Sequence, residues 1–148
     1  RIENWDRTTL LEQERVFGRQ KCSVAPIGLQ DEFDELDFDI TDGNGDPKID
    51  MAAHVRLASS EHLGGIEILR RGYNFTDGSD GFGHLDAGLF FIAFVRSPEK
   101  QFIPMQRELG RKDLLNEYIT HTGTAIFACP PGIREGDTSA YWGSTLIA

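Results

Sequence analysis

Four histidines decide which metal and redox chemistry this chain can support. They are single residues far apart in the sequence: His54, His62, His84 and His121. None belongs to an HxH, HxxxH or HExxH spacing, so a metal site built from several histidines is not indicated. One histidine is enough for haem, because the porphyrin supplies four iron ligands and the protein adds only one. Spacing alone does not choose among the four, and a single histidine is more often a surface or core residue than a ligand.

A basic pair, Arg70-Arg71, lies inside the apolar segment IEILRRGYNF and is the second feature with chemical meaning. A guanidinium keeps its charge at every working pH, so it can stabilise negative charge that develops on a leaving oxygen. The simpler alternative is an exposed cation on a strand. Neither a GxSxG motif nor a Walker loop occurs in the chain, so hydrolase chemistry has no positive support.

The segment TDGNGDPKID resembles a calcium loop only in part. Asp42, Asn44 and Asp46 have the alternate spacing of such ligands. However, Pro47 stands where an EF-hand needs its turn glycine, and Ala53 stands where the bidentate glutamate belongs. A solvated turn is therefore the preferred interpretation.

The elements that must position these residues begin with a short helix. Residues 1–6 are typical of the end of a strand, and Thr9 with Glu12 forms a capping-box pattern that starts a helix ending near Gly18. Residues 22–50 have little periodicity and many acids, glycines and prolines, which predicts a long irregular segment.

The second half of the chain predicts an antiparallel sheet with helices. Strands are expected at 66–75, 87–95 and 123–129, and helices at 98–109, with Gly110 as a stop, and at 113–120. The strand at 87–95 is almost continuously hydrophobic, which indicates burial on both faces. This order of elements predicts an α+β fold with an antiparallel sheet, in one domain covering residues 1–148.

Composition limits the partners. The 148 residues carry a formal charge of −9, with acid concentrated in residues 31–50, and such a field repels nucleic acid and anionic membranes. The longest apolar run, Ala87 to Val95, is far shorter than the roughly 20 residues of a membrane-spanning helix. Cys22 and Cys129 are expected to be buried thiols rather than a disulfide.

Five sequence strings, taken together, resemble the second half of bacterial dye-decolourising (DyP-type) haem peroxidases. In chain order they are ERVFGRQK, AAHVRLAS, ILRRGYNF, LDAGLFFIAF and LNEYITHTGTAIFACPPG. The resemblance implies two ferredoxin-like α+β domains in the full protein, with haem b held mainly by the C-terminal one. The chain is then interpreted as that ferredoxin-like C-terminal half, a fragment without the N-terminal domain.

The resemblance also implies roles for individual residues. His54, in AHVRL, matches the proximal iron ligand, and Arg70 matches the distal arginine that polarises bound peroxide. Arg19 matches an arginine that contacts a haem propionate. Leu89 and Phe91 match apolar residues on the distal side, and their period-2 spacing independently puts both on one strand face.

Two further positions concern the proximal ligand and the haem edge. An acidic residue near the NEY motif should orient the imidazole through its other nitrogen, with Asp113 the first choice and Glu117 the second. Both could instead be acids of a helix surface. Ser59 takes a position at the haem edge, in a segment where related sequences often have Asn-Pro-Arg.

The function implied is oxidation of organic substrates, such as dyes and phenolic compounds, by hydrogen peroxide at haem b. Iron removal from haem is a related activity of the family. The family's GxxDG motif, which carries the acid that moves the peroxide proton, does not occur in this chain. The alternative is therefore a non-catalytic ferredoxin-like module that binds haem or a protein partner.

Expected partners are hydrogen peroxide, a small organic reductant and the N-terminal half of the same protein, with a homo-oligomer left open. Family members are bacterial, and either export by a Tat-type signal or a cytoplasmic location is compatible with the resemblance. Electron relays to the haem edge are sought among the oxidisable aromatic residues, which are Trp5, Tyr73, Tyr118, Tyr141 and Trp142.

Overall fold

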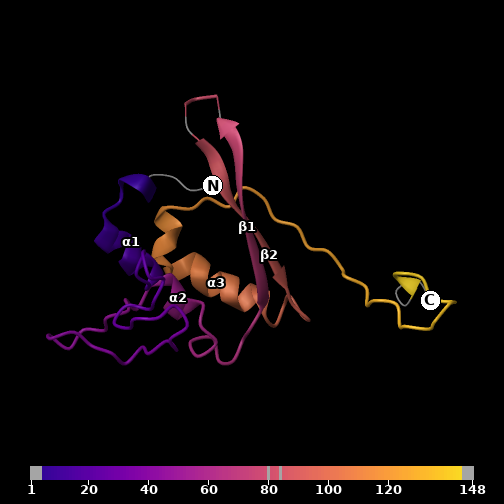
Figure 1. The fold of residues 1–148 in the computed structure, drawn as a ribbon, viewed down its shortest axis with the longest axis horizontal. Coiled ribbons are helices and arrows are strands. Elements are labelled where there is room, and N and C mark those ends of the chain that lie inside the picture. The colour runs from indigo at the N-terminus through magenta and orange to yellow at the C-terminus, as the bar shows by residue number, and fades with distance from the viewer. Residues whose placement is uncertain (1–4, 80, 84, 145–148) are drawn as a thin grey trace.

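A computed structural model describes residues 5–79, 81–83 and 85–144, in which short helices gather beside one long hairpin (Figure 1). In chain order the elements are the 3-10 turn η1 (Trp5–Arg7), α1 (Leu10–Phe17), α2 (His54–Leu57), β1 (Leu69–Ser79), β2 (Leu85–Phe94), α3 (Phe102–Lys112) and the 3-10 turn η2 (Leu114–Glu117). The predicted α+β class with an antiparallel sheet is confirmed.

Helix α1 begins and ends as its local sequence predicts. The Thr9 hydroxyl accepts the backbone N–H of Glu12 at 3.3 Å, which satisfies one free donor at the helix start. Gly18 closes the helix in the left-handed region with φ +80°, and its N–H donates to the carbonyl of Glu14 at 2.7 Å. These signals are local, so they act whatever surrounds the helix.

Strands β1 and β2 form the two-stranded antiparallel sheet of the described residues, and both predicted strands are confirmed with shifted ends. Burial of the second strand on both faces is wrong for this chain. Leu89, Phe90, Phe91 and Phe94 remain between 45% and 63% exposed. Both faces of the hairpin are open in the described part of the chain, because its helices pack against one another rather than across the sheet.

The predicted helices after the hairpin need correction. Helix α3 starts at Phe102 rather than Pro98, and a different proline, Pro104, occupies its first turn, where the missing N–H has no intrahelical role. Gly110 does not stop it, since the helix runs to Lys112. The expected helix at 113–120 is only the short 3-10 turn η2.

The predicted strand at 123–129 is wrong. These residues have no regular secondary structure and are exposed. A strand needs a neighbour for its backbone donors and acceptors, and β1 and β2 pair only with each other among the described residues. The chain beyond η2 runs away from the helices (Figure 1). Of the predicted strand at 1–6, residues 1–4 lie outside the described residues, and Trp5 begins η1.

The core is small and lies where α1, α2 and α3 meet the irregular segment. Its buried apolar residues are Val16, Ala25, Ile49, Ala53, Leu57 and Met105. Residues 22–50 are irregular as predicted, with only isolated bridges near their ends.

Three further predictions concern the calcium-loop-like segment, the two cysteines and membrane-spanning helices. Asp42 accepts the backbone N–H groups of Asn44 (2.8 Å) and Asp46 (3.0 Å), which makes the segment a turn closed on itself. Cys22 and Cys129 are free thiols, but both are exposed, so their predicted burial is wrong. None of the described helices has the length and apolar character needed to cross a bilayer.

Candidate functional site

His54 and Asp113 form the closest side-chain pair of the candidate site. His54 is the first residue of α2, and its Nδ1 lies 2.6 Å from Oδ2 of Asp113. An ionised carboxylate only accepts hydrogen bonds, so Nδ1 carries the proton and the Nε2 lone pair of a neutral ring stays available. The His54 side chain is 26% exposed, whereas that of Asp113 is 4% exposed. A buried carboxylate therefore holds the ring, while part of the His54 side chain stays exposed.

Asp113 is held firmly because it joins two elements. It ends α3 through its N–H, which donates to the carbonyl of Leu109 at 3.1 Å. It also begins η2, where its Oδ1 accepts the N–H of Leu115 at 2.9 Å. Both carboxylate oxygens thus have a partner, so the Oδ2 that faces His54 has a fixed direction.

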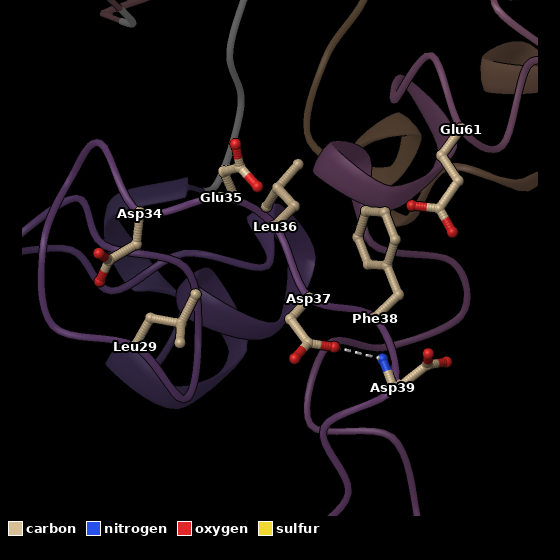
Figure 2. Close-up of a pocket in the computed structure, with 8 residues that line it drawn as sticks. All are labelled: Leu29, Asp34, Glu35, Leu36, Asp37, Phe38, Asp39 and Glu61. Atoms are coloured by element: carbon tan, nitrogen blue, oxygen red, sulfur yellow. Dashed lines mark hydrogen bonds between the residues drawn. The ribbon is translucent and has the colours of Figure 1, made fainter.

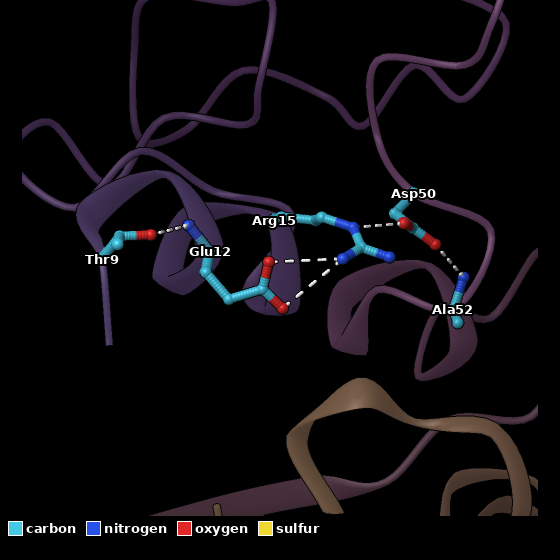
Figure 3. Close-up of polar contacts among 5 residues, drawn as sticks. All are labelled: Thr9, Glu12, Arg15, Asp50 and Ala52. Atoms are coloured by element: carbon cyan, nitrogen blue, oxygen red, sulfur yellow. Dashed lines mark hydrogen bonds and ion pairs between the residues drawn. The ribbon is translucent and has the colours of Figure 1, made fainter. Parts of the chain in front are cut away.

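The turn before His54 is tied to α1 by an ion pair (Figure 3). Asp50 accepts the N–H of Ala52 through Oδ1 at 2.9 Å, and its Oδ2 accepts from Nε of Arg15 at 2.7 Å. Arg15 also pairs with Glu12 one turn earlier in α1. On the other side, the N–H of Leu114 donates to the carbonyl of Ala52 at 3.2 Å. The short helix α2 is therefore positioned from both neighbouring elements.

The ion pair shifts the pKa values of both partners in the directions that strengthen it. Burial alone would raise the pKa of Asp50. The hydrogen bond from Ala52 and the hydrogen bond and charge of Arg15 outweigh it, so the pKa lies below its ordinary value of 3.8. The hydrogen bond to Asp50 is the largest cause that raises the pKa of Arg15. The pair is therefore charged at neutral pH.

Aromatic rings surround the His54 pair on one side. The ring of Phe17 lies 6.0 Å from the imidazole of His54, and the ring of Trp5 lies 5.4 Å from Phe17. Tyr118 contacts Trp5 at 5.0 Å. All three ring pairs are edge-to-face, the arrangement that aromatic quadrupoles favour. Rings from η1, α1 and the end of η2 thus form one row that leads to His54.

The hairpin brings Arg70, Leu89 and Phe91 to one face. Directly paired residues of an antiparallel sheet share a face. The register pairs Arg70 with Ala93, Gly72 with Phe91 and Asn74 with Leu89, positions two residues apart along each strand.

Gly72 makes room for the aliphatic member of this face. A Cβ at Gly72 would lie 3.0 Å from Cδ1 of Leu89, so the absence of a side chain lets Leu89 lie across β1. Arg70 therefore shares one face of the hairpin with two apolar residues, Leu89 and Phe91.

A separate hollow of about 500 Å³ lies in the irregular segment and has an acidic lining (Figure 2). Its lining residues are Leu29, Asp34, Glu35, Leu36, Asp37, Phe38, Asp39 and Glu61. The Asp37 carboxylate accepts the N–H of Asp39 at 2.9 Å. None of the expected site residues lines it. Among the described residues, the lining of this hollow included, no group of three or more His, Cys, Asp or Glu side chains could hold a metal ion.

Comparison with known proteins gives the family. The sequence model of "Dyp-type peroxidase, C-terminal" matches residues 1–134. The chain belongs to the Dyp-type peroxidases. It is 42% identical to the dye-decolorizing peroxidase of Thermobifida fusca, a match over 99% of this chain and 33% of the relative. It is 38% identical to the deferrochelatase of Escherichia coli K12, over 99% of this chain and 34% of the relative.

Solved structures agree with the family and confirm the ferredoxin-like α+β fold. Ferric DtpA from Streptomyces lividans matches with a TM-score of 0.77 at 36% identity, covering 80% of this chain and 33% of that one. The DyP-type peroxidase of Cellulomonas bogoriensis gives a TM-score of 0.74 at 35% identity, over 78% of this chain and 32% of that one. This Dyp-type chain thus spans about a third of the length of the relatives it matches.

The remaining expected site residues of the Dyp-type chain are engaged locally. Nη1 of Arg19 donates to the carbonyls of Val24 (2.7 Å) and Glu32 (3.1 Å), so part of its guanidinium closes the irregular segment. The Ser59 hydroxyl donates to the carbonyl of Arg56 at 2.7 Å, just after α2. Glu117, the second choice beside His54, ends η2 as an exposed residue.

Sequence reasoning missed the residues that position the candidate site. Arg15 and Asp50 are 35 positions apart, and no local pattern marks their ion pair. Phe17 next to His54 was also missed. The nearest signal was the helix LLEQERVFG, whose Gly18 end brings Phe17 close to the turn before His54.

Proposed function

We propose that this chain is the haem-holding part of a peroxidase that oxidises organic substrates, such as dyes and phenolic compounds, with hydrogen peroxide. In this proposal Nε2 of His54 would hold the iron of haem b. The observation that carries it is the 2.6 Å contact between His54 Nδ1 and the buried carboxylate of Asp113. A histidine that binds a metal commonly donates its other ring N–H to such a group.

The donor set of the site fits haem. One accessible imidazole nitrogen, with no cluster of three ligands among the described residues, suits an iron that already has four porphyrin nitrogens. Bound haem would supply the iron at which the O–O bond of peroxide is cleaved. Asp113 fixes the Nδ1–H tautomer, orients the ring and makes Nε2 a stronger donor to iron.

The hairpin face supplies the other groups that the proposal needs. Arg70 carries a permanent positive charge, which would bind and stabilise negative charge on a departing peroxide oxygen. Leu89 and Phe91 lie on the same face and would keep bulk water from that charge. Arg19 and Ser59 are proposed to contact the edge of the haem.

The N-terminal half of the protein is the proposed partner of the hairpin. The chain spans about a third of its relatives, and it has no GxxDG motif to carry the acid that moves the peroxide proton. That acid would come from the N-terminal half. A second candidate function is removal of iron from haem, supported by the 38% identity to the deferrochelatase of E. coli. A third is binding of haem or a partner without turnover.

Haem titration of matched histidine variants tests the ligand. His62 provides the control, because it too is partly exposed and pairs with a carboxylate, that of Glu108 at 3.0 Å. We expect His54→Ala to abolish the Soret band of a tightly bound haem and His62→Ala to leave it unchanged. A Soret band unaffected by His54→Ala would exclude His54 as the ligand.

Turnover distinguishes the peroxidase from the other functions. We expect peroxide-dependent dye oxidation when the N-terminal half is present and almost none from this chain alone. Release of free iron with recovery of intact porphyrin would favour the deferrochelatase activity. Haem binding without either reaction in the complete protein would favour the non-catalytic module.

A further inference from the structure

We infer that Gln101 is a positioning residue for Arg70. Its side-chain amide fixes the hairpin of β1 and β2 to the start of α3, and so sets the separation between Arg70 and His54. The inference rests on the proposed haem peroxidase function, in which haem and peroxide lie between these two residues. Gln101 would act on the reaction through the hairpin, not through a contact with haem or peroxide.

Two segments outside helix and strand join the hairpin to the helices. Residues 58–68 lead from α2 into β1, and residues 95–101 lead from β2 into α3. The first segment contains Gly64 and Gly65, both with positive φ, where a Cβ would meet nothing within 4 Å. Glycines in open space leave the backbone free to bend. The angle of the hairpin therefore depends on what holds these two segments together.

The side chain of Gln101 binds both segments. Its Oε1 accepts the backbone N–H of Arg96 at 2.9 Å and that of Ser97 at 3.1 Å. Its Nε2 donates to the carbonyl of Glu67 at 2.8 Å, 34 residues away in the chain. An amide offers an acceptor and donors at one position, and the reverse orientation would set NH2 against two N–H groups. These three bonds, the Gln101 bridge, connect the start of β1 with the end of β2.

Side-chain packing does not replace the Gln101 bridge. A hollow of about 600 Å³ lies at the base of the hairpin, and Leu69, Phe94 and Val95 line it together with Gln101. Leu69 and Phe94 are 68% and 48% exposed. Because apolar side chains leave this base open, the hydrogen bonds of Gln101 are what fixes it in the described part of the chain.

Helix α3 connects the Gln101 bridge with the proposed ligand. Gln101 is the residue that precedes α3, and Asp113 is the residue that follows it. Oδ2 of Asp113 lies 2.6 Å from Nδ1 of His54. The 11 residues of α3 span about 16 Å as a rigid helix, and Met105 anchors it in the core. In Figure 1, α3 runs from the base of the hairpin toward the other helices, so it acts as a spacer between Arg70 and His54.

Arg70 is close enough to the Gln101 bridge to be controlled by it. Arg70 is three residues from Glu67, about 10 Å along an extended chain. Its cross-strand partner Ala93 is three residues from Arg96, the other end of the bridge. A displacement of about 1 Å in a reacting group can cost about 100-fold in rate. A small change at the base of the hairpin is therefore enough to affect the reaction.

Gln101→Glu separates positioning from a simple turn-closing role. Closing the turn before α3 needs only Oε1 and the N–H groups of Arg96 and Ser97, which a carboxylate still accepts. Positioning of the hairpin also needs a donor to the carbonyl of Glu67, which a carboxylate lacks. Below the ordinary glutamate pKa of about 4.3 the protonated acid regains one O–H donor, so the variant contains its own rescue.

Kinetics of the haem-loaded complete protein gives the first test. We expect Gln101→Glu to keep the Soret band, to lose about 10–100-fold in kcat/KM for hydrogen peroxide at pH 6, and to recover at pH 4. Gln106→Glu is the matched control, because Gln106 lies in α3 and its side chain makes no hydrogen bond among the described residues. Its kcat/KM should follow the wild type at both pH values.

A double variant shows whether Gln101 acts through Arg70. In an Arg70→Ala background, Gln101→Glu should cost little further rate, because no guanidinium remains to be positioned. An equal loss of rate with and without Arg70 would overturn the inference.

Spin-label distances measure the same displacement without haem or turnover. The labels are placed in the haem-free complete protein at Thr76→Cys on β1 and Leu11→Cys on α1, both exposed positions. The native exposed thiols are replaced by serine. Thr76 is nine residues from Glu67 and Arg70 is three, so about 1 Å at Arg70 corresponds to about 3 Å at Thr76.

The distance between the labels decides the inference. We expect Gln101→Glu to shift or broaden it by about 3 Å at pH 6 and to restore it at pH 4, with no change in Gln106→Glu. An unchanged distance in Gln101→Glu would overturn the inference, whatever the rate. If Gln101→Glu does not fold, Gln101→Ala decides by the same distance. Absence of a Soret band in the wild type would overturn the proposed function instead, and the label distances would still show whether Gln101 positions the hairpin.

Discussion

Asp113 uses its two carboxylate oxygens for different partners, and an amide cannot replace both. Oδ1 accepts the N–H of Leu115, and Oδ2 faces Nδ1 of His54. In Asp113→Asn one of the two positions becomes an NH2 donor. If the amide oxygen keeps Leu115, the NH2 faces Nδ1 and favours the tautomer with the proton on Nε2. That tautomer has no lone pair on Nε2, the nitrogen proposed to bind iron.

We therefore expect Asp113→Asn to move the His54 proton from Nδ1 to Nε2 and to weaken haem binding. Nitrogen-15 NMR of the imidazole ring in the haem-free chain reads the tautomer directly, and haem titration reads the affinity. Glu117→Gln is the matched control, because Glu117 is four residues away and exposed. An unchanged tautomer in Asp113→Asn, or the same change in Glu117→Gln, would contradict the assignment of Asp113.

At the residue scale, the ion pair of Asp50 and Arg15 also stabilises the fold, and this stabilisation depends on pH. The folded-state pKa of Asp50 lies below its ordinary value of 3.8. The stabilisation is then fully present above about pH 3.8 and is lost as the pH falls through the lower folded-state pKa. The Arg15 side chain is half exposed, so the pair is worth about 0.2–1 kcal/mol.

Urea unfolding of wild type and Asp50→Asn measures this contribution. We expect Asp50→Asn to lower the free energy of unfolding at pH 6, with the difference shrinking toward zero below pH 3.8. Asp39→Asn, an exposed carboxylate of the same irregular segment, should have little effect at pH 6. A difference for Asp50→Asn that is as large in acid as at pH 6 would mean that the carboxylate charge is not what stabilises the turn.

At the scale of elements, α2 depends on its neighbours, because four residues cannot form a stable helix alone. Gly18, at the end of α1, approaches the segment on both sides of His54 closely. A Cβ on Gly18 would lie 2.5 Å from Cγ1 of Val55, 3.0 Å from Cγ2 of Ile49 and 3.3 Å from Cβ of Ala53. Its φ of +80° also disfavours any residue with a side chain.

Gly18→Ala should therefore lower the free energy of unfolding by about 2–4 kcal/mol, from left-handed strain and overpacking together. It should also displace α2 and weaken haem binding. Gly43→Ala is the control, since its Cβ would meet nothing within 4 Å, and we expect a change within about 0.5 kcal/mol. Equal effects of the two substitutions in thermal or urea unfolding would show that the Gly18 contact does not support the site.

Sequence patterns predicted elements where the signal is local. Thr9 and Gly18 bound α1 by capping alone, and the β-branched and aromatic runs predicted both strands of the hairpin. Pro98 and Pro104 are equally suited to a helix start, so the sequence predicted that α3 begins at Pro98, whereas it begins at Phe102. Residues 123–129 have strand-like composition, but composition cannot supply a pairing partner.

The sequence predicted one contact of the candidate site, that between His54 and Asp113, but not the contacts that surround it. The family resemblance named His54 and two acids, and the choice of Asp113 over Glu117 depends on how η2 packs against α2. The row from Trp5 to His54 depends on the return of η1 to α1, which no periodicity encodes. Long-range contacts of this kind arise from tertiary packing, not from local propensity.

At the scale of the whole molecule, the described part of the chain exposes apolar surface on the hairpin and in the unpaired segment. Leu69, Phe90 and Phe94 on one hairpin face, with Ile126 and Phe127 in the unpaired segment, are between 48% and 82% exposed. Exposed apolar faces and unpaired strand edges favour association with another polypeptide segment. The relatives are about three times as long as this chain, and we propose that the N-terminal half covers these surfaces.

Hydrogen exchange of the same backbone amides can be measured in this chain alone and in the complete protein. In this chain alone, the amides of residues 121–129 should exchange nearly unprotected, while those of α1 and α3 are protected. In the complete protein we expect exchange at 121–129 to slow by about 100-fold, equal to about 2.7 kcal/mol, because the segment gains a strand partner. The amides of α1 and α3 serve as the internal control, since their hydrogen bonds exist in both. Exchange at 121–129 that stays fast in the complete protein would mean that the N-terminal half docks elsewhere.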